Sequence, residues 1–415
     1  MQKPKQGYKL VKWLFGKEIE IPEEWEIKKI IDLTKVSVGL VINPSTYFDE
    51  NGTVPMITGK NVTENGIVLY DVDFITEKSN KLLETTRIWS GDLVTMRVGY
   101  PGRTSVVKNE HDGINCASVI ITRGSKKFVS EFLGYLANSR LISKQIIMHQ
   151  AGGAQQVVNT GSWKEFLIPF PSIQEQQKMA YILSNVDDLI SSYNNIIDST
   201  KKLKKGLMQQ LLTKGIGHKK FRDSEVGKIP EGWIIETLGN VCQIRKENKI
   251  NSDLYVGLEH LSQGTNLLVG RGNVTQFTST KNTFKKGDVL YGKLRPLLNK
   301  VWLSMEDGYC STDILPLKVN DKLDNRILVK LLTSPDFVLF ASSTSAGTKM
   351  PRTNWSDIQK YKIKLPSISE QQKIAFMLDG VDSKISELES KKMYLETLKK
   401  GLMQKLLTGQ IRIRV

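Results

Sequence analysis

Pro171-Ser172-Ile173-Gln174-Glu175-Gln176-Gln177-Lys178 returns 195 residues later as Pro366-Ser367-Ile368-Ser369-Glu370-Gln371-Gln372-Lys373. At this offset, residues 151–215 align with residues 346–410 without a gap, and 27 of the 65 aligned positions are identical. Two copies of a long unit exclude a solenoid, which needs at least three short repeats. The repeat instead predicts a pseudo-two-fold molecule built from a single chain.

Weaker matches in front of each constant segment extend the repeat. The stretch Ile21–Trp25 corresponds to Ile229–Trp233, and Gly91-Asp92 corresponds to Gly287-Asp288. The chain therefore reads as a variable module followed by a constant segment, repeated once. The predicted limits are residues 1–158 for the first module, 159–215 for its helical segment, 216–228 for a linker, 229–353 for the second module and 354–415 for its helical segment.

Each constant segment has the pattern of a long helix. Ser172, with Glu175 three residues later, predicts a capping box, and apolar residues then follow in the alternating steps of a heptad seam. We predict two helices of about 40 residues, each roughly 60 Å long, that pack on each other; ordinary core packing is the alternative. The predicted seam consists of Ile182, Val186, Leu189, Tyr193, Ile196, Thr200, Leu203 and Leu207, and in the second copy of Met377, Val381, Leu388, Leu395, Leu398 and Leu402, with Ile374, Leu378 and Ile385 in an adjacent stripe.

The two variable modules have a mixed pattern. Short apolar runs bounded by Gly, Asp and Asn, such as Gly91–Thr95 and Ser118–Ile121, are typical of strands, whereas Asn325–Leu332 has helical spacing. A module of about 130 residues can form its own core. We therefore predict an α+β protein, in which two globular α/β modules are separated by two long helices.

The net charge indicates a polyanionic partner. The 415 residues include 59 Lys and Arg against 43 Asp and Glu, a net charge of +16. Such an excess is typical of proteins that bind nucleic acid, although solubility alone is an alternative explanation. The excess lies mostly outside the two modules, so any DNA contact by a module requires a few well-placed residues.

The sequence gives no sign of export or of a membrane. No apolar run approaches the roughly 20 residues that cross a bilayer, and the first residues lack the apolar core of a signal peptide. Cys116, Cys242 and Cys310 are too few and too scattered for a disulfide framework. We predict a location in a reducing cytoplasm and no membrane partner.

Recognisable catalytic motifs are missing from the sequence. It contains no GxxxxGK[ST] phosphate loop, no GxGxxG and no HExxH, and its 4 histidines are far apart. Glu389-Ser390-Lys391 has the ExK spacing of metal-dependent nucleases, with Asp336 upstream, and Glu247-Asn248-Lys249 has the same spacing. Because charged residues on a long helix usually face solvent, we predict no catalytic residue and no metal site.

Four loops carry most of the residues that we predict to contact DNA. Arg97–Arg103 and its counterpart Lys293–Lys300 follow strands, and residues 149–156 and 345–352 precede the constant segments. Arg and Lys can bond guanine, and Asn and Gln adenine, in the major groove; a solvated loop is the alternative for each residue. The candidate DNA contacts are Lys60, Asn61, Arg97, Tyr100, Arg103, Gln155, Gln156, Lys293, Arg295, Asn299, Lys300, Lys349 and Arg352.

With these features in place, the sequence resembles the specificity subunit of type I restriction-modification systems over essentially its whole length. The resemblance rests on the two IP-x-x-W stretches, the Gly-Asp strand starts, the P-S-I-x-E-Q-Q-K helix openings and the KKGLMQ endings at residues 204–209 and 399–404. It implies two target-recognition domains, each reading one half of a bipartite, asymmetric DNA site, and two antiparallel conserved helices between them. The stretch Lys9–Glu20 departs from the family pattern.

The same resemblance implies a non-catalytic subunit with several partners. These are double-stranded DNA, two methyltransferase subunits that bring S-adenosylmethionine to methylate adenine N6, and restriction/translocase subunits that bring ATP and Mg²⁺. No cofactor is expected on this chain itself.

Leu207, Met208, Leu402 and Met403 lie near equivalent helix ends, and we predict that the methyltransferase subunits dock there. A purely intramolecular seam is the alternative for each of these residues. Two other functions stay open: a stand-alone restriction or methylation enzyme with a fused recognition module, and a coiled-coil scaffold without a role on DNA.

Overall fold

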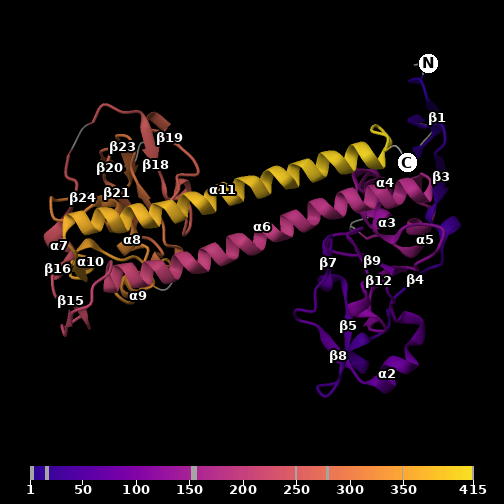
Figure 1. The fold of residues 1–415 in the computed structure, drawn as a ribbon, viewed down its shortest axis with the longest axis horizontal. Coiled ribbons are helices and arrows are strands. Elements are labelled where there is room, and N and C mark those ends of the chain that lie inside the picture. The colour runs from indigo at the N-terminus through magenta and orange to yellow at the C-terminus, as the bar shows by residue number, and fades with distance from the viewer. Residues whose placement is uncertain are drawn as a thin grey trace. The chain divides into compact units, whose positions relative to one another are not determined.

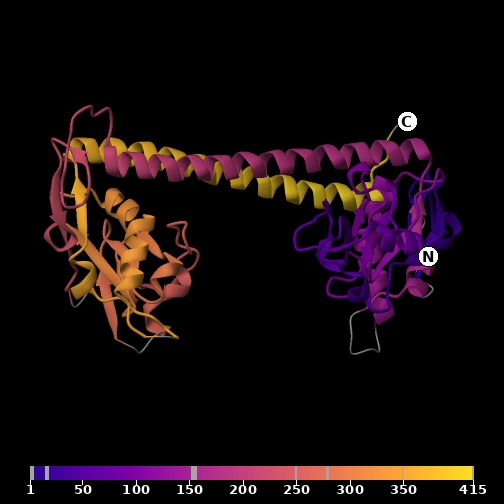
Figure 2. The same ribbon diagram turned by 90° about the horizontal axis from the view of Figure 1, so that it is seen from below.

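The structure is a computed structural model that describes residues 4–14, 18–150, 157–247, 250–276, 280–347 and 349–413. The chain divides into two compact units: unit 1 is Met1–Asn194 with Ser390–Val415, and unit 2 is Asn195–Glu389. Each unit contains one variable module and a part of each of two long helices, α6 (Ile173–Lys214) and α11 (Ile368–Leu407) (Figure 1). In both units the module lies on one side of its helical segments (Figure 2).

The module of unit 1 is built around two small sheets. The order of the four-stranded antiparallel sheet is β10-β9-β12-β4, and the order of the three-stranded sheet is β11-β5-β8, with β11 and β5 parallel. A ribbon of β3 with β13 joins the start of the module to the start of α6. The strands are β3 (Glu26–Lys29), β4 (Val36–Val38), β5 (Val54–Ile57), β6 (Val62–Thr63), β7 (Gly66–Ile67), β8 (Asp73–Ile75), β9 (Leu93–Met96), β10 (Thr104–Val106), β11 (Asn115–Cys116), β12 (Val119–Thr122) and β13 (Leu167–Phe170), and the helices are α1 (Ile30–Leu33), α2 (Glu77–Leu82), α3 (Ser130–Ala137), α4 (Arg140–Gln150) and α5 (Thr160–Glu165).

The module of unit 2 repeats this plan. Its sheets have the orders β17-β24-β21-β22 and β19-β18-β23-β20, with β18 and β23 parallel, and its ribbon pairs β16 with β25. The modules thus share the order of the four-stranded antiparallel sheet and the parallel pair of the second sheet, although their sequences match weakly; the second sheet of unit 2 has an additional strand, β20. The strands are β16 (Ile234–Thr237), β17 (Cys242–Ile244), β18 (Leu254–Val256), β19 (Gly272–Asn273), β20 (Lys281–Phe284), β21 (Val289–Gly292), β22 (Val301–Leu303), β23 (Gly308–Ser311), β24 (Ile314–Val319) and β25 (Lys362–Leu365), and the helices are α7 (Leu238–Val241), α8 (Asn325–Leu332), α9 (Pro335–Ser343) and α10 (Trp355–Ile358).

Within the N-terminal stretch Lys9–Glu20, the described residues include parts of two antiparallel strands, β1 (Tyr8–Lys12) and β2 (Glu18–Pro22), in which Tyr8 pairs with Pro22. The counterpart in unit 2 is short: β14 (Phe221–Arg222) pairs with β15 (Ile229–Pro230), and Phe221 faces Pro230. The extension therefore lengthens an element that both units possess. The predicted linker 216–228 carries β14 as part of this element.

The repeated PSIxEQQK stretch fastens each module to the start of a long helix. Ser172 accepts the backbone N–H of Glu175 at 3.3 Å, which confirms the predicted cap at Ser172. The Glu175 carboxylate has another use than the capping box, because it accepts the indole N–H of buried Trp25 at 3.1 Å. Trp233 makes the same 3.1 Å bond to Glu370 in unit 2. The IPxxW and PSIxEQQK patterns thus meet in one contact of each unit, a tryptophan–glutamate hydrogen bond that we call the lock.

A glutamine completes each lock. Gln176 donates to the carbonyl of Pro171 and accepts the N–H of Val129, and Gln371 does the same with Pro366 and Asp324. Both glutamine side chains are fully buried. Buried polar groups in native proteins find partners because an unpaired one is costly, so these two residues tie the module loops to the helix starts.

The helical segments run antiparallel within each unit. In unit 1, Asp187 of α6 pairs with Lys399 of α11 at 2.6 Å. In unit 2, Lys204 of α6 pairs with Asp382 of α11 at 2.5 Å, and Lys201 pairs with Glu389 at 2.7 Å. The partners rise in number along one helix as they fall along the other. The predicted α+β class with an internal repeat and two long antiparallel helices is confirmed.

The predicted seam is only partly correct. Val186 and Leu388 are buried as predicted, but Leu189, Ile196 and Leu203 are 49%, 48% and 57% exposed. The buried face is shifted, because each helical segment packs on a module core as well as on the other helix. The residues of this shifted face include Met179, Leu183 and Ile197 in α6 and Ile374, Leu378 and Ile385 of the adjacent stripe in α11.

We expect Asp382→Ala to destabilise unit 2 by more than Asp187→Ala destabilises unit 1. Asp382 and Asp379 both pair with the ammonium of Lys330, whose side chain is 5% exposed. At the equivalent position of unit 1, the hydroxyl of Tyr135 donates to Asp187 at 2.7 Å. Removing a carboxylate from a buried cation should cost about 2–3 kcal/mol with Asp379 still present, against about 1–2 kcal/mol for the stranded hydroxyl. Urea unfolding of both variants measures the difference, and equal losses would contradict it.

Acid should weaken the same cluster. Burial alone would raise the pKa of Asp382, but hydrogen bonds from Lys204 and Lys330 outweigh burial and hold this pKa below its ordinary value. A carboxyl with a lowered folded-state pKa stabilises the fold above about pH 5 and loses that contribution as pH falls through the lowered pKa. Asp382→Ala should therefore unfold with less pH dependence between pH 5 and 3 than the unchanged chain.

Candidate nucleic-acid interface

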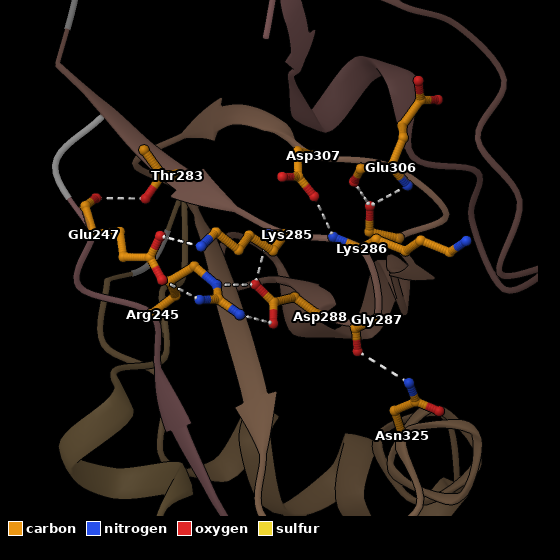
Figure 3. Close-up of polar contacts among 11 residues, drawn as sticks. Arg245, Glu247, Thr283, Lys285, Lys286, Gly287, Asp288, Glu306, Asp307 and Asn325 are labelled. Atoms are coloured by element: carbon orange, nitrogen blue, oxygen red, sulfur yellow. Dashed lines mark hydrogen bonds and ion pairs between the residues drawn. The ribbon is translucent and has the colours of Figure 1, made fainter. Parts of the chain in front are cut away.

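The two Gly-Asp motifs begin the strands that lead to the candidate DNA loops. Gly91 and Gly287 have φ of +85° and +91°, a conformation that suits glycine because it has no Cβ. The next residue is a buried aspartate in both units. Figure 3 shows Asp288 accepting two bonds from the guanidinium of Arg245 and one from the backbone N–H of Lys285. The hydrogen bonds to Asp288 raise the pKa of Arg245 against the opposing effect of burial.

Asp92 has the same role with an arginine from elsewhere in the sheet. It accepts from Arg123 at 2.6 Å and from the backbone of Trp89 and Gly124 at 3.0 and 2.8 Å. Arg123 follows β12, whereas Arg245 follows β17, the counterpart of β4. Neighbouring strands thus supply the cation in the two units. A linear alignment misses this exchange, because the two arginines are not at equivalent positions.

In unit 1, the loop after β9 lies beside the chain that enters the constant segment. Val98 forms a β-bridge with Val157, and the carbonyl of Arg97 accepts the N–H of Val158 at 3.0 Å. Tyr100 is 64% exposed, and the guanidinium carbon of Arg103 lies 4.1 Å from the centroid of its ring. Arg97 is half-buried, and its Nε has no hydrogen-bond partner among the described residues. Gln155 and Gln156 lie outside the described residues.

Unit 2 has the same arrangement. Leu294 forms a β-bridge with Arg352, and the carbonyl of Lys293 accepts the N–H of Thr353 at 3.1 Å. The bridged partners Val157 and Arg352 are 195 residues apart, which is the offset of the repeat. The structure therefore brings the two predicted loops of unit 2 together. In unit 1, the loop after β9 bridges Val157, the residue that directly follows the second predicted loop.

The candidate residues of unit 2 differ in how free their side chains are. Arg295 and Lys349 are exposed. The Arg295 guanidinium donates to the carbonyl of Lys349 at 3.4 Å, and its backbone N–H donates to the carbonyl of Pro351 at 2.7 Å. Arg352 is paired with Asp313 at 3.1 Å, which raises the pKa of its guanidinium. Lys300 donates to the carbonyl of Leu258 at 2.6 Å, and half-buried Lys293 donates its backbone N–H to Asp313. Asn299 is half-buried and donates to Thr333 at 3.4 Å.

Lys60 and Asn61 lie in the 3₁₀ turn Gly59–Asn61. Asn61 is fully buried, and its amide donates to the carbonyls of Val68 and Tyr70 and accepts from Thr58. Its described contacts therefore hold its own loop and give no support to a base contact. Lys60 is exposed and pairs with Asp71 at 2.9 Å. In unit 2, His260 is at the position that corresponds to Asn61, and it accepts the backbone N–H of Gly257.

Exposed apolar side chains complete both loop surfaces and were missed by the sequence-based prediction, which considered mainly polar residues there. Val98 is 63% exposed in unit 1, and Leu297 and Met350 are 64% and 53% exposed in unit 2. Apolar contacts can read the methyl group of thymine. Their position in loops bounded by Gly and Pro was the available signal, because a large apolar residue in such a loop has no core to join.

The predicted docking residues face the module cores in part. Leu207 and Met208 are half-buried against the core of unit 2, and Leu402 and Met403 are half-buried against the core of unit 1. Each helix end thus packs on the module of the other repeat. Docking of a partner on their remaining surface stays a prediction.

The acidic residue of the nuclease-like ExK stretch takes part in an ion pair between the two long helices. Glu389 of the ExK stretch forms an ion pair with Lys201. Among the described residues, no group of three or more His, Cys, Asp or Glu side chains is placed to hold a metal ion. In the same part of the chain, no helix is both long and apolar enough to span a bilayer.

Comparison with known proteins places this geometry in a family. The family model described as type I restriction modification DNA specificity domain matches residues 22–202 and 230–396. The MjaVIII specificity subunit of Methanocaldococcus jannaschii is 26% identical, with 95% of each chain covered, and the EcoDI specificity subunit of Escherichia coli is 22% identical, with 86% of this chain and 80% of the relative covered.

Solved structures share the fold. A chain from a study of complex assembly in a type I restriction-modification system has a TM-score of 0.59 at 16% identity, with 94% of this chain and 99% of that chain covered. The S subunit of M. genitalium has a TM-score of 0.56 at 14% identity, with 94% and 97% covered.

Proposed function

Since the chain belongs to the type I restriction-modification DNA specificity family, we propose that each of its modules reads one half of a bipartite, asymmetric DNA target. The specificity subunits of this family are DNA-recognition components without catalysis. The proposal assigns each half of the target to one module of the chain.

One observation carries the proposal. Each unit has the same backbone frame, in which a loop after a central strand bridges the chain that enters a constant helix. The side chains on the two frames differ: Arg97, Tyr100 and Arg103 in unit 1, and Lys293, Arg295 and Arg352 in unit 2. A common frame with different side chains suits two readers of different sequences, because base-edge contacts specify sequence whereas phosphate contacts do not.

The side chains fit such a role. Arg103 and Arg295 can each bond the O6 and N7 of guanine, and exposed Tyr100 keeps the guanidinium of Arg103 stacked in place. In this proposal, Lys349 and Arg352 contact phosphates or bases beside Arg295; the nearness of the three residues supports it, since the carbonyl of Lys349 accepts from Arg295 and Arg352 bridges Leu294. The apolar Leu297 and Met350 add surfaces for thymine methyl groups.

The chemistry belongs to partners in this proposal. Two methyltransferase subunits bind the chain and bring S-adenosylmethionine, and restriction/translocase subunits bring ATP and Mg²⁺. A stand-alone enzyme is the alternative, and methylation or cleavage of DNA by the purified chain alone would favour it.

We expect the length of the helices to set the spacer between the two half-sites. Four residues inserted between Asn194 and Thr200 lengthen α6 by about 6 Å at 1.5 Å per residue, which is close to two base pairs at about 3.4 Å each. Four residues also form a stutter that a helix pair absorbs by local unwinding, so the fold should survive, whereas two residues would turn the buried face away.

Mapping of methylated adenines in cells tests both the proposal and this prediction. The unchanged chain should give one bipartite motif with two unrelated halves. The four-residue insertion should keep both halves and lengthen the spacer by one or two base pairs. An unchanged spacer in an active variant would contradict the role of the helices.

A further inference from the structure

One edge of the module in unit 1 carries the two most exposed large apolar side chains in the described part of the chain. Tyr70 is 86% exposed and Ile42 is 78% exposed. Neither was among the residues that the sequence analysis predicted to contact DNA. A single exposed apolar side chain is ordinary on a protein surface, so the argument depends on where these two lie and on how they are held.

The strand register brings both side chains to the same edge of the module. Asp73, the first residue of β8, pairs near the end of β5, and β11 pairs with the same end of β5. Leu40 forms a β-bridge with Ala117, the residue that follows β11. Ile42 lies two residues after Leu40, and Tyr70 lies three residues before Asp73. The edge at which β5 and β11 end therefore carries both.

The loop that carries Tyr70 is held by its neighbours. The buried amide of Asn61 donates to the carbonyls of Val68 and Tyr70 at 3.0 and 3.1 Å. The ammonium of Lys60 pairs with Asp71 at 2.9 Å. The backbone on both sides of the exposed ring is thus fixed by contacts with the 3₁₀ turn Gly59–Asn61, although the ring itself faces solvent.

Left-handed backbone conformations concentrate on this edge. Among the described residues of unit 1, the non-glycine residues with positive φ are Asn43 (+41°), Asp71 (+52°) and Ser118 (+57°). Asn43 directly follows Ile42, and Asp71 directly follows Tyr70. Such conformations are uncommon outside glycine, and they cluster at functional sites, where the surrounding structure holds them. Each exposed apolar side chain is therefore presented by a tight turn.

This edge is continuous with the candidate reading loop after β9. A Cβ atom on Gly59 would lie 3.2 Å from Cγ of Met96, the last residue of β9. The sulfur of Met96 accepts the backbone N–H of Tyr100 at 3.2 Å. The turn that holds Tyr70 thus packs on the strand end from which the reading loop begins.

The charge of the edge favours DNA as its partner. Its cations are Lys60, Arg97 and Arg103, and its one carboxylate, Asp71, is paired with Lys60. A duplex offers phosphates to the cations and, in the major groove, thymine methyl groups to the apolar side chains. The segments counted are residues 40–43, 58–61, 70–71, 97–103 and 117–118.

We propose that Ile42 and Tyr70 are further sequence-reading residues of unit 1, which contact the methyl groups of thymines in the major groove. The inference rests on the proposed function and extends its reading surface from the loop after β9 to the loops after β4 and β7. The C5 methyl group is the feature that marks thymine in the major groove. Unit 1 should therefore select thymine at the positions that these side chains reach.

Deoxyuridine tests the proposal, because it lacks only the C5 methyl group of thymidine. The chain assembled with its methyltransferase subunits is titrated with its mapped target, in which each thymine is replaced in turn. Loss of one contacted methyl group should weaken binding about fourfold for at least one thymine of the half-site that unit 1 reads. Ile42→Ala and Tyr70→Ala should each bind the thymine duplex more weakly by a similar factor, and the difference between thymine and uracil should disappear at the position that the side chain contacted.

Matched variants separate this effect from a general loss of apolar surface. Tyr70→Phe keeps the ring and should keep the preference for thymine over uracil. Leu82→Ala removes a side chain that is 72% exposed on α2, which follows the opposite end of β8, and should bind every duplex like the unchanged chain. Thermal melts of all variants should coincide within a few degrees, which shows that the fold is kept.

The outcomes separate the inference from the proposed function. If the unchanged assembly binds the mapped target no better than a duplex with both halves scrambled, the proposed function fails. If it discriminates both halves but binds every uracil duplex like the thymine duplex, or if the thymine preference persists in Ile42→Ala and Tyr70→Ala, this inference alone is overturned. If these two variants bind DNA normally and instead lose methyltransferase subunits in native mass spectrometry, the edge contacts protein, and the inference is wrong.

Discussion

Replacing residues 21–158 with the corresponding module of another specificity subunit should change one half of the DNA target and leave the other half unchanged. The loop Arg97–Arg103 and its β-bridge partner Val157 move together in this exchange, so the whole candidate reading surface of unit 1 is replaced. Each wrong base pair costs a specific complex about 1–3 kcal/mol, and a half-site of several base pairs should therefore switch completely. Mapping of methylated adenines in cells that carry the hybrid measures the result.

The design of the hybrid follows from the contacts of the lock. The exchange removes Trp25 and Val129, which bond Glu175 and Gln176 of the retained segment. The donor module should therefore carry a tryptophan at the position that corresponds to Trp25. A hybrid from a donor without it is the control, and we expect that hybrid to unfold more easily. A change in both halves of the target on exchange of one module would contradict the assignment of one half-site to each module.

Asp288→Ala should have the largest effect on stability among single substitutions in unit 2. The side chains of Asp288 and Arg245 are 3% and 9% exposed. Loss of the aspartate leaves a buried guanidinium with Glu247 as its remaining carboxylate (Figure 3). Breaking a buried ion pair at one partner costs about 3–5 kcal/mol, a large share of the stability of a typical domain. Hydrogen exchange of β21 and urea unfolding measure the loss.

Two controls sharpen this prediction. Asp92→Ala in unit 1 should cost less, about 1–3 kcal/mol, because Arg123 is 22% exposed and keeps bonds to the carbonyls of Arg87 and Thr85. The double variant Arg245→Met, Asp288→Leu should be close to the unchanged chain, since apolar replacement of a buried pair is often neutral. A loss below about 1 kcal/mol for Asp288→Ala would show that the pair is not structurally important.

The repeat made the fold predictable, whereas the seam was predictable only in part. Identity at 195-residue spacing located both long helices and the entry of each module. A heptad pattern assumes that a helix packs on one partner, and here Met179 and Leu183 also pack on a module core. That second neighbour shifts the buried face and leaves Leu189 and Leu203 exposed. The pattern of apolar residues alone contains no information about a neighbour distant in sequence.

The candidate site was predictable as a set of loops but not as a set of free side chains. The Gly-rich segments after β9 and β21 do meet the chain that enters each constant segment. The sequence could not indicate that the amide of Asn61 would be used by the carbonyls of Val68 and Tyr70, or that Lys300 would bond the carbonyl of Leu258. These partners are set by the folded structure. Residue type alone does not distinguish an amide that stabilises its own loop from an amide that contacts a DNA base.

The most direct test of the two-reader account is the affinity of the chain, assembled with its methyltransferase subunits, for four duplexes of equal length: the mapped target, the target with either half scrambled, and the target with both halves scrambled. The account predicts that each scrambled half lowers the affinity, that the two losses add within about 0.5 kcal/mol, and that Arg103→Ala removes the discrimination of one half only. Equal loss of discrimination at both halves in Arg103→Ala, or indifference to one scrambled half in the unchanged chain, would contradict it.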